Sequence, residues 1–467
     1  MTKSTDIRVL EIQLATQQID YRTPMKFGGR VVADVIVADA TVRVVDRQGR
    51  GATGRGSMTM GNAWAWPSTT VASDRTLAGM TSLFERLGES FVGDPAGDCD
   101  EFGDPLELGH RLNRVAATQS RLLEREEAWG EPMPVLAQRV VASPIDAAIH
   151  DAFGRLLGAS SFGCLGRELI NHDLSHHLDT SFQGEYLDQY ISAKAVDVLP
   201  LYHLVGALDP LTPEDLEASG VAPQDGLPLL LDDWIRADGL DHLKIKLAGD
   251  DLEWDVARVL SIDHLAEAVW LEQGKSPGVY SLDFNERCAD VAYVLEFLDQ
   301  VRSARPQAFD RVQYIEQPTH RDLKGRGAID MRRAAEVKPV VIDESLLDLE
   351  SLYDARSLGY SGIALKACKG QTDSLLMAAA ARKFGMFLCV QDLTCVGASF
   401  LHSASLAAHV PGVAAIEGNG RQYCPRGNQG WDAMYPGMFQ IDHGRVHTNS
   451  VDGWGLGFEW LGATPGA

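Results

Sequence analysis

The sequence predicts an α/β protein built around a barrel of parallel strands, which follows a smaller α+β region. Between residues 199 and 417, short apolar runs alternate with amphipathic stretches, as repeated strand–helix units do. Valine-rich alternating runs before residue 60 indicate strands, and apolar residues at helical spacing over 73–160 indicate helices. No GxGxxG motif follows a predicted strand, which disfavours the rival open, doubly wound sheet.

Eight barrel strands are expected, each a short apolar run that ends in polar or turn residues. Their predicted ranges are 199–205, 242–247, 279–284, 312–316, 339–343, 362–367, 387–391 and 413–417. Amphipathic periodicity predicts helices between several of them. These helices cover 251–272, 289–302, 323–335 and 372–384, and two earlier ones cover 76–87 and 106–127.

Composition narrows the range of partners. The chain has 467 residues, 45% of them hydrophobic, and a net charge of −23. Such an acidic surface is repelled by nucleic acid and by anionic lipid. The seven cysteines form no CxxC pair, which is typical of reduced thiols in a cytoplasm. Because signal-peptide and membrane-spanning patterns are also missing, we expect a cytoplasmic protein without nucleic-acid or membrane partners.

Acidic residues end three successive predicted strands. Asp283, Glu316 and Asp343 are separated by 33 and 27 residues, about one strand–helix–strand unit each. The C-terminal ends of barrel strands form the floor of the active site, so the three carboxylates should converge. Buried like charges repel unless a cation holds them together. Oxygen ligands of this kind suit Mg²⁺, with Mn²⁺ as the alternative.

Lysines end the predicted strands on either side of these acids. Lys246 lies on strand two and Lys366 on strand six, and strand periodicity puts Lys244 on the same face as Lys246. A lysine beside a dication and a second lysine has its charged form disfavoured and can act as a base. Two opposed bases can remove a proton from one face of a substrate and return it to the other.

In this order, the strings LKIK, SLDFNE, YIEQP, VVIDES and ALKACKG, together with the helix over 143–158, resemble the enolase superfamily. The similarity is to its mandelate racemase / muconate lactonizing enzyme branch, in which lysine bases act with Mg²⁺. The resemblance implies a modified TIM barrel, (β/α)7β, with an N-terminal α+β capping domain. We expect the capping domain at 1–140, the barrel at 141–425 and a segment returning to the capping domain at 426–467. The branch usually forms dimers or octamers, so a homo-oligomer is expected.

The resemblance also assigns roles to residues. Asp283, Glu316 and Asp343 match the metal ligands, whereas Lys246 and Lys366 match the two general bases. Lys244 matches the lysine that neutralises the substrate carboxylate. Glu344, beside Lys366, and Asn285 match supporting positions. Lysines on both strands place the chain nearer the muconate lactonizing and dipeptide epimerase type than the His–Asp dyad type.

Further residues are candidates for substrate binding. Trp64, in a loop over 61–68, would contact an apolar part of the substrate, or else only pack between the domains. Arg30, at the end of a loop over 23–30, would bind a second anionic group. Glu417 and Asp392 end strands eight and seven, where Glu417 binds substrate or serves as a structural acid. The Asp-x-Asp of dipeptide epimerases is missing after strand eight, which argues against a dipeptide substrate.

Together these observations predict a Mg²⁺-dependent enzyme that removes the proton α to a carboxylate through a metal-stabilised enediolate. The expected outcome is racemisation or epimerisation, or cycloisomerisation, of a small carboxylic acid. Dehydration of a hydroxy acid or acid sugar is the alternative, since elimination also needs a base and an acid. A non-catalytic binding protein on the same barrel is the second alternative.

Overall fold

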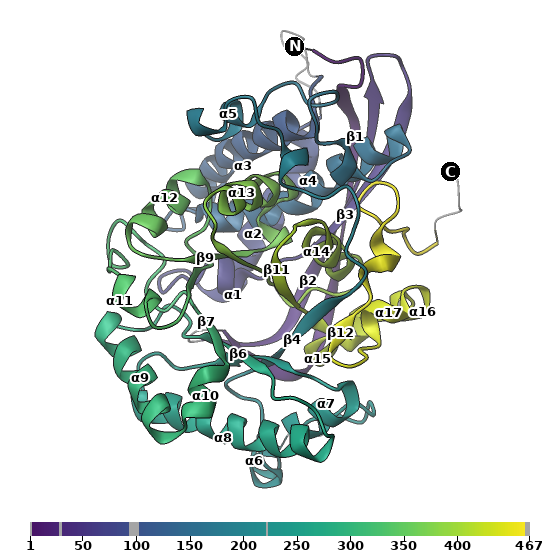
Figure 1. Cartoon of the computed structure of the whole chain (residues 1–467). Helices are drawn as coiled ribbons and strands as arrows, with labels where there is room; N and C mark the ends of the chain where they lie inside the picture. The colour runs from purple at the N-terminus through teal and green to yellow at the C-terminus, as the bar shows by residue number, and fades with distance from the viewer. Residues whose placement is uncertain (1, 28–29, 93–101, 221–222, 463–467) are drawn as a thin grey trace.

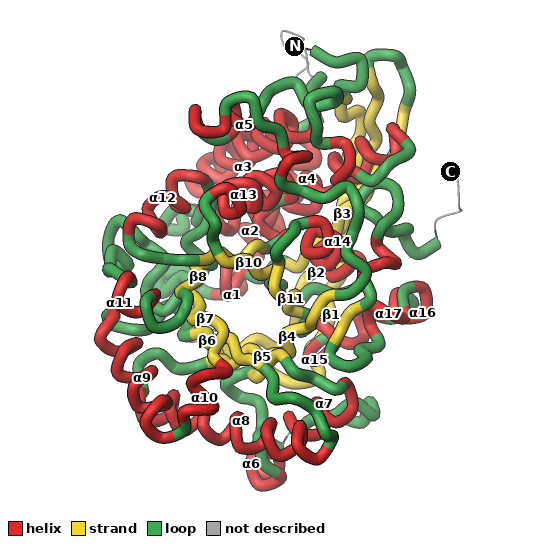
Figure 2. The backbone as a smooth tube through the Cα atoms, viewed as in Figure 1, coloured by secondary structure: helices red, strands yellow, loops and turns green. Residues whose placement is uncertain are grey.

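Eight parallel strands, β4 to β11, close into a barrel, and an antiparallel sheet of three strands stands beside it (Figures 1 and 2). The computed structural model describes residues 2–27, 30–92, 102–220 and 223–462. Strand β11 pairs with β4, which closes the ring. The predicted parallel barrel with an N-terminal capping region is therefore confirmed.

The barrel strands lie almost where the apolar runs placed them. Three of the eight begin and end at the predicted residues, and the others differ by one to two residues at an end, which is ordinary for strand termini. Their bounds are β4 Leu199–Val205, β5 His242–Lys246, β6 Val279–Asp283, β7 Val312–Glu316, β8 Val340–Ile342, β9 Gly362–Leu365, β10 Phe387–Val390 and β11 Val413–Glu417. A short strand, β12 Arg445–Val446, pairs antiparallel with the start of β4.

Helices follow most of the barrel strands and cover the outside of the ring (Figure 2). They are α6 Pro213–Ser219, α7 Leu231–Asp238, α8 Leu252–Glu272, α9 Val291–Ala304, α10 Pro306–Arg311, α11 Arg332–Ala335, α12 Leu349–Ser357, α13 Gln371–Lys383 and α14 Ala398–His409. One predicted helix was largely wrong, because only Arg332–Ala335 of the range 323–335 is helical. Asp322 accepts from the backbone N–H groups of Lys324 and Gly325 and makes a turn instead.

The capping region joins a curved sheet to three helices. The sheet holds β1 Ile7–Phe27, β2 Arg30–Asp46 and β3 Gly51–Thr59, and the helices are α2 Ser73–Ser90, α3 Pro105–Glu127 and α4 Val135–Leu157. Helix α4 crosses β3 at Gly54 and Gly56, where a Cβ atom would lie 2.2 and 2.1 Å from backbone atoms of α4. Glycine permits this close approach of two backbones.

One arm of the sheet reaches over the barrel. The expected loop over 23–30 is instead the end of a long hairpin, since β1 continues to Phe27 and β2 begins at Arg30. Met25 and the nearby apolar residues of this arm form one buried cluster with Leu204, Val396 and Tyr423 of the barrel. The hairpin is therefore held against the carboxyl ends of the strands, where the predicted site residues lie.

The last part of the chain contacts the end of α4 and the residues that follow it. Gly455 exchanges backbone hydrogen bonds with Ala159 and Ser161, just after α4. Arg155 of α4 pairs with Glu459.

In the described residues no helix has the length and apolar character needed to cross a membrane. Six cysteines lie within those residues, all of them buried and none in a disulfide.

Candidate active site

The predicted site residues gather at the carboxyl ends of the barrel strands. In the sheet register Lys246 lies beside Asp283, and Asp283 lies beside Glu316. The chain then turns sharply, because Asn285 and Gln317 have φ angles of 52° and 30°. Left-handed backbone of this kind is uncommon outside glycine, and it often marks functional sites.

Lys244 lies at the centre of the acidic group. Its Nζ is 2.9 Å from Glu316 Oε1, 3.0 Å from Glu417 Oε2 and 3.4 Å from Asp283 Oδ2. The side chain is almost fully buried. Burial alone would lower its pKa, but the surrounding carboxylates, Glu316 first, raise the pKa well above the usual value. The surrounding carboxylates therefore favour the charged form of Lys244.

Lys246 and Lys366 contact different ends of the row of acids. Lys246 Nζ donates a short hydrogen bond to Asp283 and lies 5.7 Å from the ring centre of Phe27 in the capping hairpin. Lys366 Nζ is 2.8 Å from Asp343 Oδ2 and 4.4 Å from the ring centre of Trp64. Each lysine thus sits between a barrel carboxylate and an aromatic ring of the capping region, a position stabilised by cation–π attraction.

Two polar residues that sequence reasoning missed complete the group. Lys369 Nζ donates to the backbone oxygen of Asp343 at 2.5 Å and lies 3.1 Å from its Oδ1. Gln391, at the end of β10, donates to Glu316. The string ALKACKG carries a second lysine three positions after Lys366. That spacing is one helical turn, and the 3₁₀ turn over Ala367–Lys369 turns both ammonium groups toward the same acid.

The buried charges of the group do not balance. Six carboxyl groups and four lysines at the strand ends are at most 7% exposed, which leaves an excess of two negative charges if all are ionised. They are Asp283, Glu316, Asp343, Glu344, Asp392 and Glu417, against Lys244, Lys246, Lys366 and Lys369. An unbalanced buried charge is costly, so such a group either takes up protons or binds a cation.

The pKa values reflect this imbalance. Burial raises the pKa of Glu316 well above its usual value, and Asp283 adds to the effect. Burial opposes ionisation of Asp343 too, but Lys366 and Lys369 outweigh it and hold its pKa at about 2. In return, Asp343 overcomes the burial of Lys366 and raises the pKa of that lysine. The lysines therefore carry the countercharge of the group. The contact with Asp343 favours the charged form of Lys366, whereas the sequence predicted that this form would be disfavoured.

Three of the strand-end carboxylates suit a hard dication, although their side chains do not surround a single point in the described structure. Asp283, Glu316 and Asp343 are buried oxygen donors from neighbouring strands, and Asp343 Oδ2 faces only Lys366 Nζ in the described structure. No three His, Cys, Asp or Glu side chains among the described residues already surround one point. Lysine ammonium groups occupy the space between the carboxylates. A dication would bring the two charges that the group lacks.

Trp64 links the capping region to the barrel. It belongs to a short helix, α1 Asn62–Ala65, and its indole Nε1 donates to Glu344 Oε1 at 2.8 Å. Burial, with the neighbouring Asp343 next, raises the pKa of Glu344 to about 8. Asn285, the other predicted supporting residue, accepts from Lys246 at 3.4 Å and donates to the backbone oxygen of Leu247. Asn285 therefore contacts Lys246, whereas Glu344 is bonded to Trp64.

The last two strands contribute a separate pair of acids. Asn419 joins them, since its side chain donates to Glu417 and its backbone N–H to Asp392. Burial raises the pKa of Asp392 to about 8, and the nearby Glu417 adds to the effect. Asp392 also accepts from the backbone N–H groups of Thr394 and Cys395. These contacts give Asp392 a structural role in the turn after β10, whereas Glu417 faces Lys244.

A cavity of about 280 Å³ opens beside this centre. Phe27, Arg30 and Trp64 line it from the capping region, while Asn285 and Glu344 line it from the barrel. Arg30 donates to the backbone oxygen of Ser68, and its buried Nη1 has no hydrogen-bond partner in the described structure. Arg30 thus borders the cavity, and in the described structure it makes no hydrogen bond or ion pair with the lysines or the strand-end acids.

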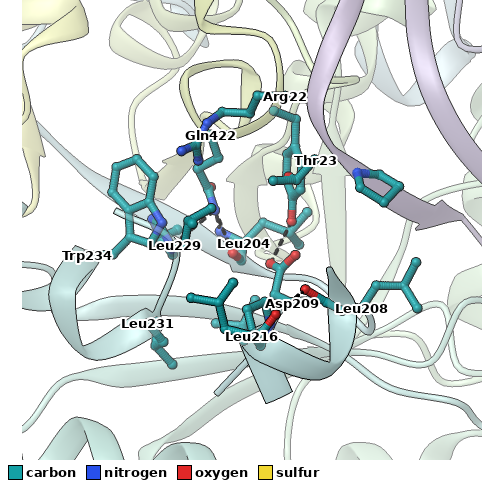
Figure 3. A pocket seen from close by; sticks show the side chains of 16 residues that line it. Arg22, Thr23, Leu204, Leu208, Asp209, Leu216, Leu229, Leu231, Trp234 and Gln422 are labelled. Carbon is teal, nitrogen blue, oxygen red and sulfur yellow. Dashed lines mark hydrogen bonds between the residues drawn. The ribbon is translucent and has the colours of Figure 1, made fainter. Parts of the chain in front are cut away.

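A second cavity, of about 260 Å³, lies apart from the predicted site residues (Figure 3). Its lining is mainly apolar and comes from β4, from α7 and from the segment that leads to it, with Arg22 and Thr23 of β1 at one side. Asp209 projects into it but is already bonded to Tyr423 and to the backbone of Gly206. None of the sequence-predicted site residues lines this cavity.

Comparison with known proteins agrees with the geometry. The family model described as "Enolase C-terminal domain-like" matches residues 229–463. The chain belongs to the enolase superfamily, in its mandelate racemase / muconate lactonizing enzyme branch. No curated protein matches the sequence significantly.

Solved structures of this superfamily share the fold at low identity. Muconate lactonizing enzyme from Pseudomonas fluorescens, complexed with muconolactone, is 15% identical over 97% of this chain and 96% of its own, with a TM-score of 0.59. A mandelate racemase/muconate lactonizing protein from Herpetosiphon aurantiacus is 19% identical over 98% and 100%, with a TM-score of 0.61. An enolase from Bradyrhizobium, complexed with magnesium and mandelic acid, is 17% identical over 99% and 97%, with a TM-score of 0.59.

Proposed function

We propose that this protein is a Mg²⁺-dependent enzyme that removes the proton α to the carboxylate of a small carboxylic acid. The observation that carries the proposal is the pair of buried lysines, Lys246 and Lys366, at opposite ends of one row of acids. A base on each side of a substrate carbon can take a proton from one face and deliver one to the other. Racemisation or epimerisation is therefore the first expectation, and cycloisomerisation the second.

Each central residue receives a role from its contacts. Lys246 and Lys366 exchange the α-proton at Nζ. Lys244, which already holds Glu316 and Glu417, neutralises the substrate carboxylate. Trp64 covers Lys366 from the capping region and keeps water from that side of the site. Lys369 and Gln391 hold the side chains of Asp343 and Glu316 in place.

Mg²⁺, or Mn²⁺ in its place, would be held by Asp283, Glu316 and Asp343. When bound, the ion would supply the positive charge that stabilises a carboxylate taking on a second negative charge. The proposal draws support from the buried acids of this group, which outnumber its buried lysines by six to four. It also draws support from relatives of the same fold, among them the Bradyrhizobium protein complexed with magnesium and mandelic acid.

The test is proton NMR in D₂O, with Mg²⁺ and pooled α-substituted carboxylic acids. The expected result is loss of an α-proton signal, because a lysine that exchanges with solvent returns deuterium. EDTA should abolish the exchange, and Lys246→Ala should abolish it for the enantiomer that Lys246 deprotonates. Lys324→Ala serves as the matched control, since this lysine is exposed and pairs only with Glu350 and Asp354.

The products distinguish the reaction classes. The mirror isomer indicates a racemase, a lactone or diene a cycloisomerase, and a 2-keto acid a dehydratase. Exchange that survives both EDTA and Lys246→Ala contradicts the proposed chemistry. A protein that shows no exchange, and whose thermal stability ignores both Mg²⁺ and EDTA, is instead a binding protein on an enolase-type barrel.

A further inference from the structure

Four histidines gather on the capping region, at the face formed by α3 and the short helix α5 Leu174–His177 (Figure 1). His110 comes from α3, and His172, His176 and His177 come from the segment that crosses it. The rings of His172 and His176 stack with centres 4.1 Å apart. The ring of His176 stands edge-on to that of His177 at 5.1 Å.

Two of the ring nitrogens already have the spacing of ligands on one metal ion. His110 Nε2 lies 3.0 Å from His177 Nδ1, with the two rings nearly parallel. Two histidine nitrogens that bind the same Zn²⁺ at about 2.0–2.1 Å lie about 2.9–3.4 Å apart for bond angles between a right angle and the tetrahedral angle. A direct N–H···N hydrogen bond explains the same distance, so the geometry fits both.

A carboxylate lies within the same group. Glu107 is one helical turn before His110, and its Oε1 is 3.3 Å from His172 Nε2. The other oxygen, Oε2, is occupied by Asn171 and by the backbone of Asp104. Oε1 is therefore the oxygen that faces the histidines.

The nitrogens border an open space. Glu107, His110, His176 and His177 line a cavity of about 340 Å³, together with the exposed Arg114. His177 Nε2 is buried there and has no hydrogen-bond partner in the described structure. A buried ring nitrogen without a partner is unfavourable, and a water in the cavity would satisfy Nε2. Nδ1, on the other side of the same ring, is the nitrogen that faces His110.

We propose that His110 and His177, with Glu107 and one of His172 or His176, form a second metal site for a first-row transition cation such as Zn²⁺. Imidazole ligands select such cations, whereas the carboxylates at the strand ends suit Mg²⁺. Since no three ligands already converge among the described residues, the third arrives by rotation of an exposed ring such as that of His176. The bound ion would cross-link the segment after residue 170 to helix α3. This site does not depend on the proposed function of the barrel.

The test is a Zn²⁺ titration of the full chain against a chromophoric chelator, with millimolar Mg²⁺ present to occupy the oxygen site. The wild type should take up one Zn²⁺ that His110→Ala and His177→Ala each bind at least about tenfold more weakly, since even supporting residues around a metal affect affinity by about tenfold or more. His443→Ala is the matched control, because the side chain of this histidine is largely exposed and pairs with Asp442. Its Zn²⁺ uptake should equal that of the wild type.

A spectroscopic readout guards against misfolding. Co²⁺ added in place of Zn²⁺ should give visible d–d absorption in the wild type. In the folded His110→Gln variant this absorption should be weak or missing. Zn²⁺ uptake that is unchanged in His110→Ala and His177→Ala would overturn the proposal and leave the direct hydrogen bond as the explanation. Uptake that falls equally in His443→Ala would also overturn it, as non-specific surface binding.

Discussion

Replacing Lys246 with methionine should make the protein bind Mg²⁺ more tightly while it loses activity. Lys246 donates directly to Asp283, so the lysine and a cation would compete for that carboxylate. Methionine has a similar length and fits beside Phe27, but it carries no charge. The variant leaves Lys244, 3.4 Å away, as the remaining lysine contact of Asp283.

The expected change in Mg²⁺ affinity follows from the Lys246–Asp283 hydrogen bond, which the ion no longer has to displace in the variant. A hydrogen bond to a charged group contributes about 1.5–3 kcal/mol, and about 1.4 kcal/mol corresponds to a tenfold change in affinity. We therefore expect Lys246→Met to bind Mg²⁺ about 10- to 100-fold more tightly than the wild type. Asp283→Asn, which removes the ligand itself, should bind it more weakly than either.

Isothermal titration calorimetry at constant ionic strength measures this directly and needs no substrate. Lys324→Met is the control, because an exposed lysine on the barrel surface should leave the affinity unchanged. If Lys246→Met folds normally yet binds Mg²⁺ no more tightly than the wild type, Lys246 and the ion do not compete for Asp283. The metal role assigned to that carboxylate would then be wrong.

Three further outcomes are expected. Lys366→Met should lower proton exchange on one enantiomer of a chiral substrate by about 10²-fold or more and spare the other, as NMR on the separate enantiomers would detect; equal loss on both would contradict the two-base reading. Gly56→Ala should destabilise the fold by about 1–3 kcal/mol in urea titration, since its Cβ would lie 2.1 Å from the backbone oxygen of Pro144, whereas Gly51→Ala, with its nearest contact at 3.4 Å, should not. Burial raises the pKa of Asp146 to about 6, so the folded state keeps a proton that the unfolded state releases near pH 4. The free energy of unfolding should therefore fall by up to about 3 kcal/mol as the pH rises from 4 to 6. An equally steep fall in Asp146→Asn would refute this assignment.

The local order of apolar and polar residues was enough to predict the barrel strands and the charged residues at their ends. Apolar runs such as 312–316 and 413–417 became β7 and β11 without change, because strands buried on both faces are encoded by continuous apolar stretches. The polar residue that ends such a run must lie at the mouth of a parallel barrel. For this reason Lys246, Asp283 and Glu316 were found from sequence and share one register level.

Other features depend on contacts between residues that are distant in the chain. Trp64 meets Glu344 across 280 positions, and no periodicity encodes that distance. The segment 23–30 was expected to be a loop at the barrel mouth, yet pairing with β2 and burial of Met25 against the barrel make it part of a hairpin.

The sequence by itself determined the fold class and the identity of the charged residues at the barrel mouth, because both follow from the order of apolar and ionisable side chains. Only the tertiary structure decided which of those charges neutralise one another. It added Lys369 to Asp343, gave Lys244 three carboxylates and left six acids against four lysines. Electrostatic energy depends on distance and burial in three dimensions, and the linear order of residues contains neither.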